Sequence, residues 1–176
     1  ALLSVRSKRR SARLFERLSY GSYALPGIVV ALAFVYVGIN IARPLYQTLP
    51  MLLAASMVLF VPLAVAAERS ALLRVPRELE EVGYSLGGSR LASLRHVTLP
   101  LMKPGLLAGG MLIFLTVMKE LPVALLLSPL GFRTLPMLVW SNISEAFFAR
   151  AAIPTLALLL LSSAPLAWLS LRDNQT

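Results

Sequence analysis

The chain of 176 residues is 57% hydrophobic and only 14% charged, whereas ordinary globular domains are about 45–50% apolar and about 25% charged. This composition excludes a disordered chain and a protein that coats nucleic acid, because much of the surface must face something other than water. The chain contains no cysteine, which excludes disulfides, thiolate metal sites and cysteine nucleophiles. We therefore expect a protein whose surface faces lipid.

Four apolar segments of membrane-spanning length follow one another along the chain. They cover residues 23–42, 48–67, 104–127 and 151–171. About 20 helical residues at ~1.5 Å each match the ~30 Å hydrocarbon thickness of a bilayer. The sequence therefore predicts an all-α bundle of four membrane-spanning helices. Gly105 and Gly109 have the G-x-x-x-G spacing that lets two helices approach closely.

The third apolar segment has two candidate ends. Lys119 and Glu120 lie inside it, and each charge would cost roughly 2.5–3.5 kcal/mol at the bilayer centre. Pro122 indicates that the helix breaks or ends nearby. In one interpretation these three residues line an extracytoplasmic gate or the wall of a transport pathway. In the other, the span ends at Met118 and the two charges lie in interfacial water.

The basic residues are unevenly distributed along the chain. Six of the 17 Lys and Arg residues precede the first span, six lie in the segment 68–103 and Arg172 follows the last span, which leaves four elsewhere. Cytoplasmic loops of membrane proteins carry an excess of Lys and Arg. We therefore expect both termini and the segment 68–103 to be cytoplasmic. This topology explains the net charge of +9 without a nucleic-acid partner.

The segment 68–103 is expected to begin with a short amphipathic helix. Pro76 is followed by several acidic residues, which are favourable in the first turn of a helix, and Gly87 stops the helix. Its apolar residues recur at helical spacing and comprise Leu79, Val82 and Leu86. An exposed apolar stripe on a short polar helix predicts a partner that buries it.

A second short helix is expected after a Gly-Gly turn. Ser89 can cap it, and it should run to about His96 and end before Pro100. His96 is the only histidine of the chain, and we expect it to be solvated or to cap the helix rather than to bind a ligand. The two helices would form a cytoplasmic knob.

The residues of this knob carry a recognisable spacing. After Glu81-Val82-Gly83 the chain has three residues, then Gly87, nine more residues and Val97-Thr98-Leu99-Pro100. The string resembles the E-A-A, x3, G, x9, I-x-L-P loop of permease subunits of ATP-binding-cassette importers, the MetI-like family. Val82, Gly83 and Val97 depart from that pattern but are small or apolar, like the residues they replace.

The resemblance implies that the knob couples the permease to a cytoplasmic ATPase. In that family the loop lies in a groove of the cytoplasmic ATPase, which implies Glu81 and Gly87 as the central contact and turn residues. The remaining implied coupling residues are Glu78, Leu79, Val82, Val97, Leu99 and Pro100. Closure of the ATPase dimer on ATP would move the helical pair as a lever and tilt the spans on either side.

Two further stretches, Ala24–Val29 and Val117–Pro122, resemble ferric iron importer permeases. These usually fuse two repeats in one chain, which implies that the present chain, beginning at Ala1, is a single permease domain and a C-terminal fragment. The resemblance also implies the bacterial inner membrane, an extracytoplasmic solute-binding protein, an ATPase dimer and another permease repeat or subunit. Permeases for thiamine, sulfate, polyamines or phosphonates remain alternatives. A channel or secondary transporter is disfavoured because neither requires the loop spacing.

No catalytic, cofactor or metal site is expected in the chain itself. The phosphate-binding pattern G-x-x-x-x-G-K-[S/T] does not occur, so ATP hydrolysis is assigned to a partner subunit. Asp173 is the only aspartate and His96 the only histidine, which leaves no protease dyad and no visible set of three or four metal ligands. If iron is the cargo, the resemblance implies that its ligands lie on the separate binding protein.

Overall fold

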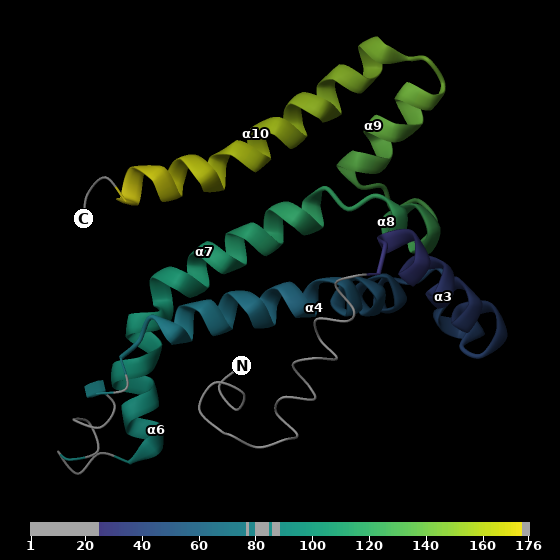
Figure 1. The fold of residues 1–176 in the computed structure, drawn as a ribbon. Coiled ribbons are helices and arrows are strands. Elements are labelled where there is room, and N and C mark those ends of the chain that lie inside the picture. The colour runs from purple at the N-terminus through teal and green to yellow at the C-terminus, as the bar shows by residue number, and fades with distance from the viewer. Residues whose placement is uncertain (1–24, 77, 80–84, 86–88, 174–176) are drawn as a thin grey trace. The chain divides into compact units, whose positions relative to one another are not determined.

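The computed structural model describes residues 25–76, 78–79, 85 and 89–173. Every regular element within these ranges is helical (Figure 1), which confirms the all-α prediction. The elements are α3 (Gly27–Asn40), η1 (Arg43–Leu45), α4 (Leu49–Leu73), α6 (Arg90–Ser93), η2 (Leu94–Thr98), α7 (Leu99–Met118), α8 (Pro122–Leu127), α9 (Leu135–Ser144) and α10 (Phe148–Asp173).

Three of these helices are long and apolar enough to cross a membrane. They are Leu49–Leu73, the continuous helical stretch Leu91–Met118 and Phe148–Pro165. The helix α3 is equally apolar but has only 14 residues, fewer than the ~20 that a perpendicular crossing needs. The expected span 23–42 is therefore shorter as a helix than the sequence predicted.

The helices extend further into the polar segment than its composition predicted. α4 continues to Leu73, Glu78, Leu79 and Ser85 are helical, and α6 begins at Arg90, so the polar segment 68–103 is helical over much of its described length. The backbone hydrogen bonds of a helix do not depend on side-chain polarity, which is why a helix can pass the end of an apolar run.

The third apolar segment is divided between two helices. α7 ends at Met118, where the N–H groups of Lys119 and Glu120 donate to carbonyls only three residues back. Such tightened bonds are common at helix ends. α8 then begins at Pro122, which is tolerated at a first helical position because it needs no N–H donor there. Of the two expected ends of the third apolar segment, the helix therefore takes the one at Met118, and residues 122–127 form a separate helix.

The second helix of the polar segment begins as expected but does not end as expected. The Ser89 hydroxyl accepts a hydrogen bond from the N–H of Ala92 at 3.2 Å, which confirms it as the cap. The helix then passes through the π-helical turn η2 into α7 instead of stopping before Pro100. Pro100 lies just beyond this π-helical turn inside the continuous stretch Leu91–Met118, so the hydrogen bond that its missing N–H removes is lost where the helix is already irregular.

The described residues divide into two structural units. One contains residues 61–112, and its buried core is formed by Ala71, Leu72, Val75 and Met102. The other contains residues 25–60 and 113–173, and its core joins α3, the first half of α4 and α8. The buried residues of this second core are Ala31, Met51, Leu52, Ala55, Val123 and Leu127. Within the second unit, α9 and α10 also pack against each other.

Within the first unit, α4 and α7 approach closely at the two glycines of the G-x-x-x-G spacing. A Cβ built on Gly105 would lie 2.7 Å from the Cβ of Ala71, and one built on Gly109 would lie 2.5 Å from the Cβ of Ala67. Neither position has room for a side chain. The prediction that these glycines permit a close helix contact is therefore confirmed, and two alanines four residues apart complete it.

Candidate functional site

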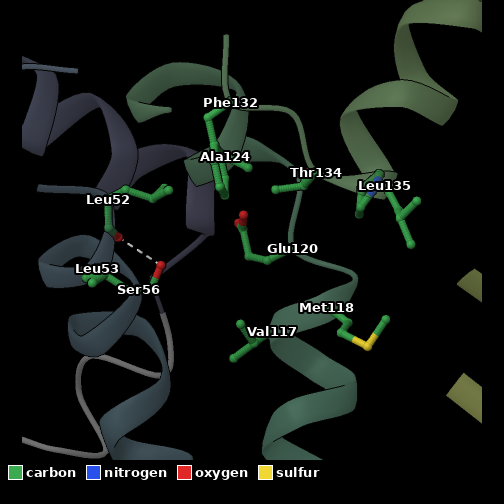
Figure 2. A pocket seen from close by; sticks show the side chains of 11 residues that line it. Leu52, Leu53, Ser56, Val117, Met118, Glu120, Ala124, Phe132, Thr134 and Leu135 are labelled. Atoms are coloured by element: carbon green, nitrogen blue, oxygen red, sulfur yellow. Dashed lines mark hydrogen bonds between the residues drawn. The ribbon is translucent and has the colours of Figure 1, made fainter. Parts of the chain in front are cut away.

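The second unit contains a cavity of about 360 Å³ (Figure 2). Its wall is mostly apolar, and its lining residues are Leu52, Leu53, Ser56, Val117, Met118, Glu120, Ala124, Phe132, Thr134, Leu135 and Pro136. They come from α4, from the end of α7 and the turn after it, from α8, and from the segment that leads into α9. In a mostly apolar cavity, the few polar groups orient a bound ligand. A polar group can do so only if its hydrogen-bonding capacity is not already used within the protein.

The two hydroxyl groups of the cavity wall already have partners. Ser56 donates to the carbonyl of Leu52 at 2.8 Å, one turn earlier in α4. Thr134 accepts from the N–H of Met137 at 3.4 Å and so caps the start of α9. Both hydroxyls therefore form hydrogen bonds with helix backbone. The ionisable residue among those that line the cavity is Glu120.

Glu120 is held by the start of α8. Its Oε2 atom accepts a hydrogen bond from the N–H of Val123 at 3.0 Å, which satisfies one of the N–H groups that have no partner within the helix. Glu120 lies beyond the end of α7 at Met118. The pKa of its carboxyl lies above the usual value, because partial burial raises this pKa by more than the hydrogen bonds from the N–H groups of Val123 and Ala124 lower it.

The second oxygen of Glu120 lies against the start of α3. A Cβ built on Gly27 would be only 2.7 Å from Oε1, so Gly27 provides space that any other residue would fill. Gly27 is the first residue of α3, after Pro26. Sequence reasoning included this glycine only as part of the stretch 24–29, and no local spacing connects it to Glu120.

The other two pathway candidates have different surroundings. Lys119 is exposed, whereas Pro122 is partly buried as the first residue of α8. The structure therefore separates the adjacent charges: the carboxylate turns toward the protein interior and the ammonium group is exposed. The interpretation that both charges belong to one gate remains a prediction.

The expected coupling residues are only partly within the described ranges. Glu78 and Leu79 are exposed, and 42% of the Leu79 surface is accessible. Val97 is partly buried, whereas Leu99 and Pro100 are exposed near the start of α7. The predicted central residues Glu81 and Gly87, and the coupling residue Val82, lie outside the described residues. Their assignment stays a prediction.

His96 and the acidic residues form no metal site in the described part of the chain. His96 is exposed, and its Nδ1 lies 3.0 Å from the carbonyl oxygen of Ala92, within its own helical stretch. Among the residues with described positions, no three His, Asp or Glu side chains come together as metal ligands would.

Comparison with known proteins places the chain in a family. The family model described as "Binding-protein-dependent transport system inner membrane component" matches residues 1–172. The chain belongs to this family. This membership confirms the resemblance to importer permeases that the loop spacing predicted, and it agrees with the apolar helices long enough to span a membrane.

Several curated permeases are similar to the chain. The Fe(3+)-transport system permease protein FbpB 2 of Haemophilus influenzae is 39% identical over 150 residues, which are 85% of this chain and 30% of that protein. PhnV of Salmonella typhimurium, a permease protein assigned to 2-aminoethylphosphonate transport, is 30% identical over 149 residues, 85% of this chain and 56% of its own. The putrescine permease protein PotI of Escherichia coli is 35% identical over 74 residues, which cover 42% of this chain and 26% of PotI. The chain thus spans roughly a third to a half of the first two relatives.

Proposed function

We propose that the chain is part of the permease of an ATP-binding-cassette importer in a bacterial inner membrane, and that ferric iron is its cargo. The match of the family model to residues 1–172 carries the first part. The 39% identity to a ferric permease supports the second. The iron would pass as cargo, delivered by an extracytoplasmic binding protein, and the energy would come from a cytoplasmic ATPase dimer.

The proposed orientation places both termini and the loop between α4 and α7 in the cytoplasm. The excess of Lys and Arg in these segments supports it. The loop between α8 and α9, with Leu130 exposed by 91% of its surface, would then lie on the extracytoplasmic side. A second permease repeat or subunit would complete the pathway, since the chain spans only part of its relatives.

The coupling role is proposed for the knob that follows Pro76. Leu79 is an apolar side chain exposed on a helical turn, which suits a residue that is covered by another subunit. The contact of Gly105 and Gly109 with two alanines of α4 joins the helices on either side of the knob. A displacement of the knob would therefore move the facing halves of α4 and α7 together, because closely packed helices do not deform independently.

The coupling proposal is tested by placing a charge at Leu79. In the full-length permease, assembled with its ATPase and binding protein, Leu79→Glu should uncouple ATP hydrolysis from uptake without unfolding the spans. Leu130→Glu is the matched control, because it adds the same charge at an exposed leucine on the proposed opposite side. The ratio of cargo transported to ATP hydrolysed should fall for Leu79→Glu only, and an unchanged ratio would refute the assignment.

The pathway role is proposed for Glu120 with Lys119 and Pro122. Glu120 lines the cavity of the second unit, which supports it as part of the pathway wall. Glu120→Gln keeps the size of the side chain and an oxygen that can accept from Val123, but removes the charge. We expect uptake to be abolished and assembly to be retained. Wild-type uptake by this variant would count against a pathway role.

The cargo is tested separately by uptake into vesicles. Radioactive Fe³⁺ delivered by the extracytoplasmic binding protein of the same importer should be transported when ATP is present. A second candidate cargo is a phosphonate, because PhnV, a permease protein assigned to 2-aminoethylphosphonate transport, is 30% identical over 85% of this chain. Transport of 2-aminoethylphosphonate with no transport of iron would overturn the ferric assignment and leave the importer assignment intact.

A further inference from the structure

The two oxygens of the Glu120 carboxylate lie at the starts of two different helices. Oε2 accepts from Val123 in the first turn of α8 at 3.0 Å. Oε1 lies where a Cβ on Gly27, the first residue of α3, would be only 2.7 Å away. One side chain therefore makes a hydrogen bond at the start of α8 and lies against the start of α3, two points that are far apart in the sequence.

The arrangement is favourable for a carboxylate. The start of a helix carries a partial positive charge, and a negative group near it is stabilised. α3 and α8 also pack against each other through a shared core, which includes Ala31, Val123 and Leu127. Their starts are thereby kept at a fixed separation, into which the carboxylate fits only if residue 27 has no side chain.

We propose that Gly27 is a positioning residue for Glu120, and that the pair forms a clasp which fixes the carboxylate in the cavity wall between α3 and α8. The inference rests on the proposed function in so far as the cavity belongs to the transport pathway. The contact between Gly27 and Glu120 is present in this chain whatever the cavity transports. Gly27 acts only through the space that it leaves, and Glu120 makes the polar contact.

The clasp predicts an unusual response to a methyl group at residue 27. The nearest atom to the added Cβ is the end of a flexible side chain, so the carboxylate moves and the backbone does not need to. Ser56, on α4, lines the same cavity. A displaced carboxylate should alter access to Ser56 while the helices remain folded.

The absence of cysteine from the chain allows a direct test. Ser56→Cys serves as the reporter in a full-length permease from which any cysteine outside this chain has been removed, and its rate of reaction with a small methanethiosulfonate reagent is measured. The reporter is combined with Gly27→Ala, with Glu120→Ala and with both. Gly110→Ala is the matched control, because a Cβ on Gly110 would meet nothing within 4 Å.

We expect Gly27→Ala to change the labelling rate several-fold in the presence of Glu120 and to have no further effect once Glu120 is alanine. Gly110→Ala should leave the rate unchanged in both backgrounds. An equal effect of Gly27→Ala in both backgrounds, or no effect in either, would overturn the clasp. If Gly27→Ala prevents folding, recovery of folded protein in the double variant supports the clasp and continued misfolding overturns it.

The labelling test does not depend on transport. Labelling needs neither ATP nor cargo, so failure of the importer assignment would leave its result unchanged. Iron uptake by the same variants supplies a second readout. The clasp predicts that Gly27→Ala lowers uptake and that Gly110→Ala does not.

Discussion

Two glycine contacts of this protein look similar in distance but differ in what they touch. Gly109 faces the Cβ and Cα of Ala67 on α4, whereas Gly27 faces a carboxylate oxygen of Glu120. The Ala67 atoms belong to the frame of a helix and cannot move without it. The carboxylate is the end of a flexible side chain. A tight glycine can therefore either fix two helices or position a functional group, and its neighbour decides which.

The largest effect is expected where the neighbour is a helix. Gly109→Ala would place a methyl group 2.5 Å from the Cβ of Ala67, so α4 and α7 must separate. Overpacking of this kind costs roughly 1–3 kcal/mol. We expect a clear fall in the apparent melting temperature of the purified permease in detergent.

A compensating change and a neighbouring glycine sharpen this prediction. Adding Ala67→Gly to Gly109→Ala removes the opposing methyl group and should restore most of the lost stability. Gly110→Ala meets open space and should raise stability, because alanine is favoured over glycine in a helix by roughly 0.5–1 kcal/mol. If Gly109→Ala and Gly110→Ala gave the same melting temperature, the close contact of α4 and α7 would be refuted.

An intermediate effect is expected at Gly38 of α3. A Cβ there would lie 2.8 Å from a ring carbon of Tyr46 and 3.0 Å from the sulfur of Met51. Methionine adapts easily to a new neighbour, whereas a tyrosine ring moves as a whole. Gly38→Ala should therefore cost about 1 kcal/mol, measured by thermal unfolding. A cost above that of Gly109→Ala would reverse the proposed order.

The smallest effect on stability is expected at Gly27. Gly27→Ala displaces only the end of the flexible Glu120 side chain, so the fall in melting temperature should correspond to about 0.5 kcal/mol, the lower end of the net contribution of one hydrogen bond. The same variant should still alter the labelling of the Ser56→Cys reporter. A loss of stability as large as that of Gly109→Ala would show that residue 27 fixes helices rather than a carboxylate.

The sequence predicted the first of these contacts and not the second. Gly105 and Gly109 are four residues apart in one apolar helix, and this local spacing identifies a face that permits close packing. It does not identify the partner helix, which the structure gives as α4 through Ala67 and Ala71. Gly27 and Glu120 share no local pattern, so only the fold brings them together.

The ends of the helices also could not be predicted from hydropathy alone. Apolar composition located the long helices, but α4 passes its apolar run and α7 ends at Met118 inside one. Hydrogen bonds of the backbone decide these ends, and hydropathy does not record them. The Ser89 cap was predictable because a hydroxyl before a helix satisfies a free N–H within three residues.

The central claim is that the segment around Leu79 protrudes into the cytoplasm and docks on an ATPase, and cross-linking from that residue tests it most directly. Leu79→Cys introduces one thiol into this chain, which has no cysteine of its own, and any cysteine in the rest of the full-length permease is first replaced by serine. In native membranes, a short bifunctional reagent should join this thiol to the ATP-binding subunit, with a yield that changes when ATP is added. Reaction of the thiol only with reagents confined to the extracytoplasmic side, and no cross-link to that subunit, would contradict the account.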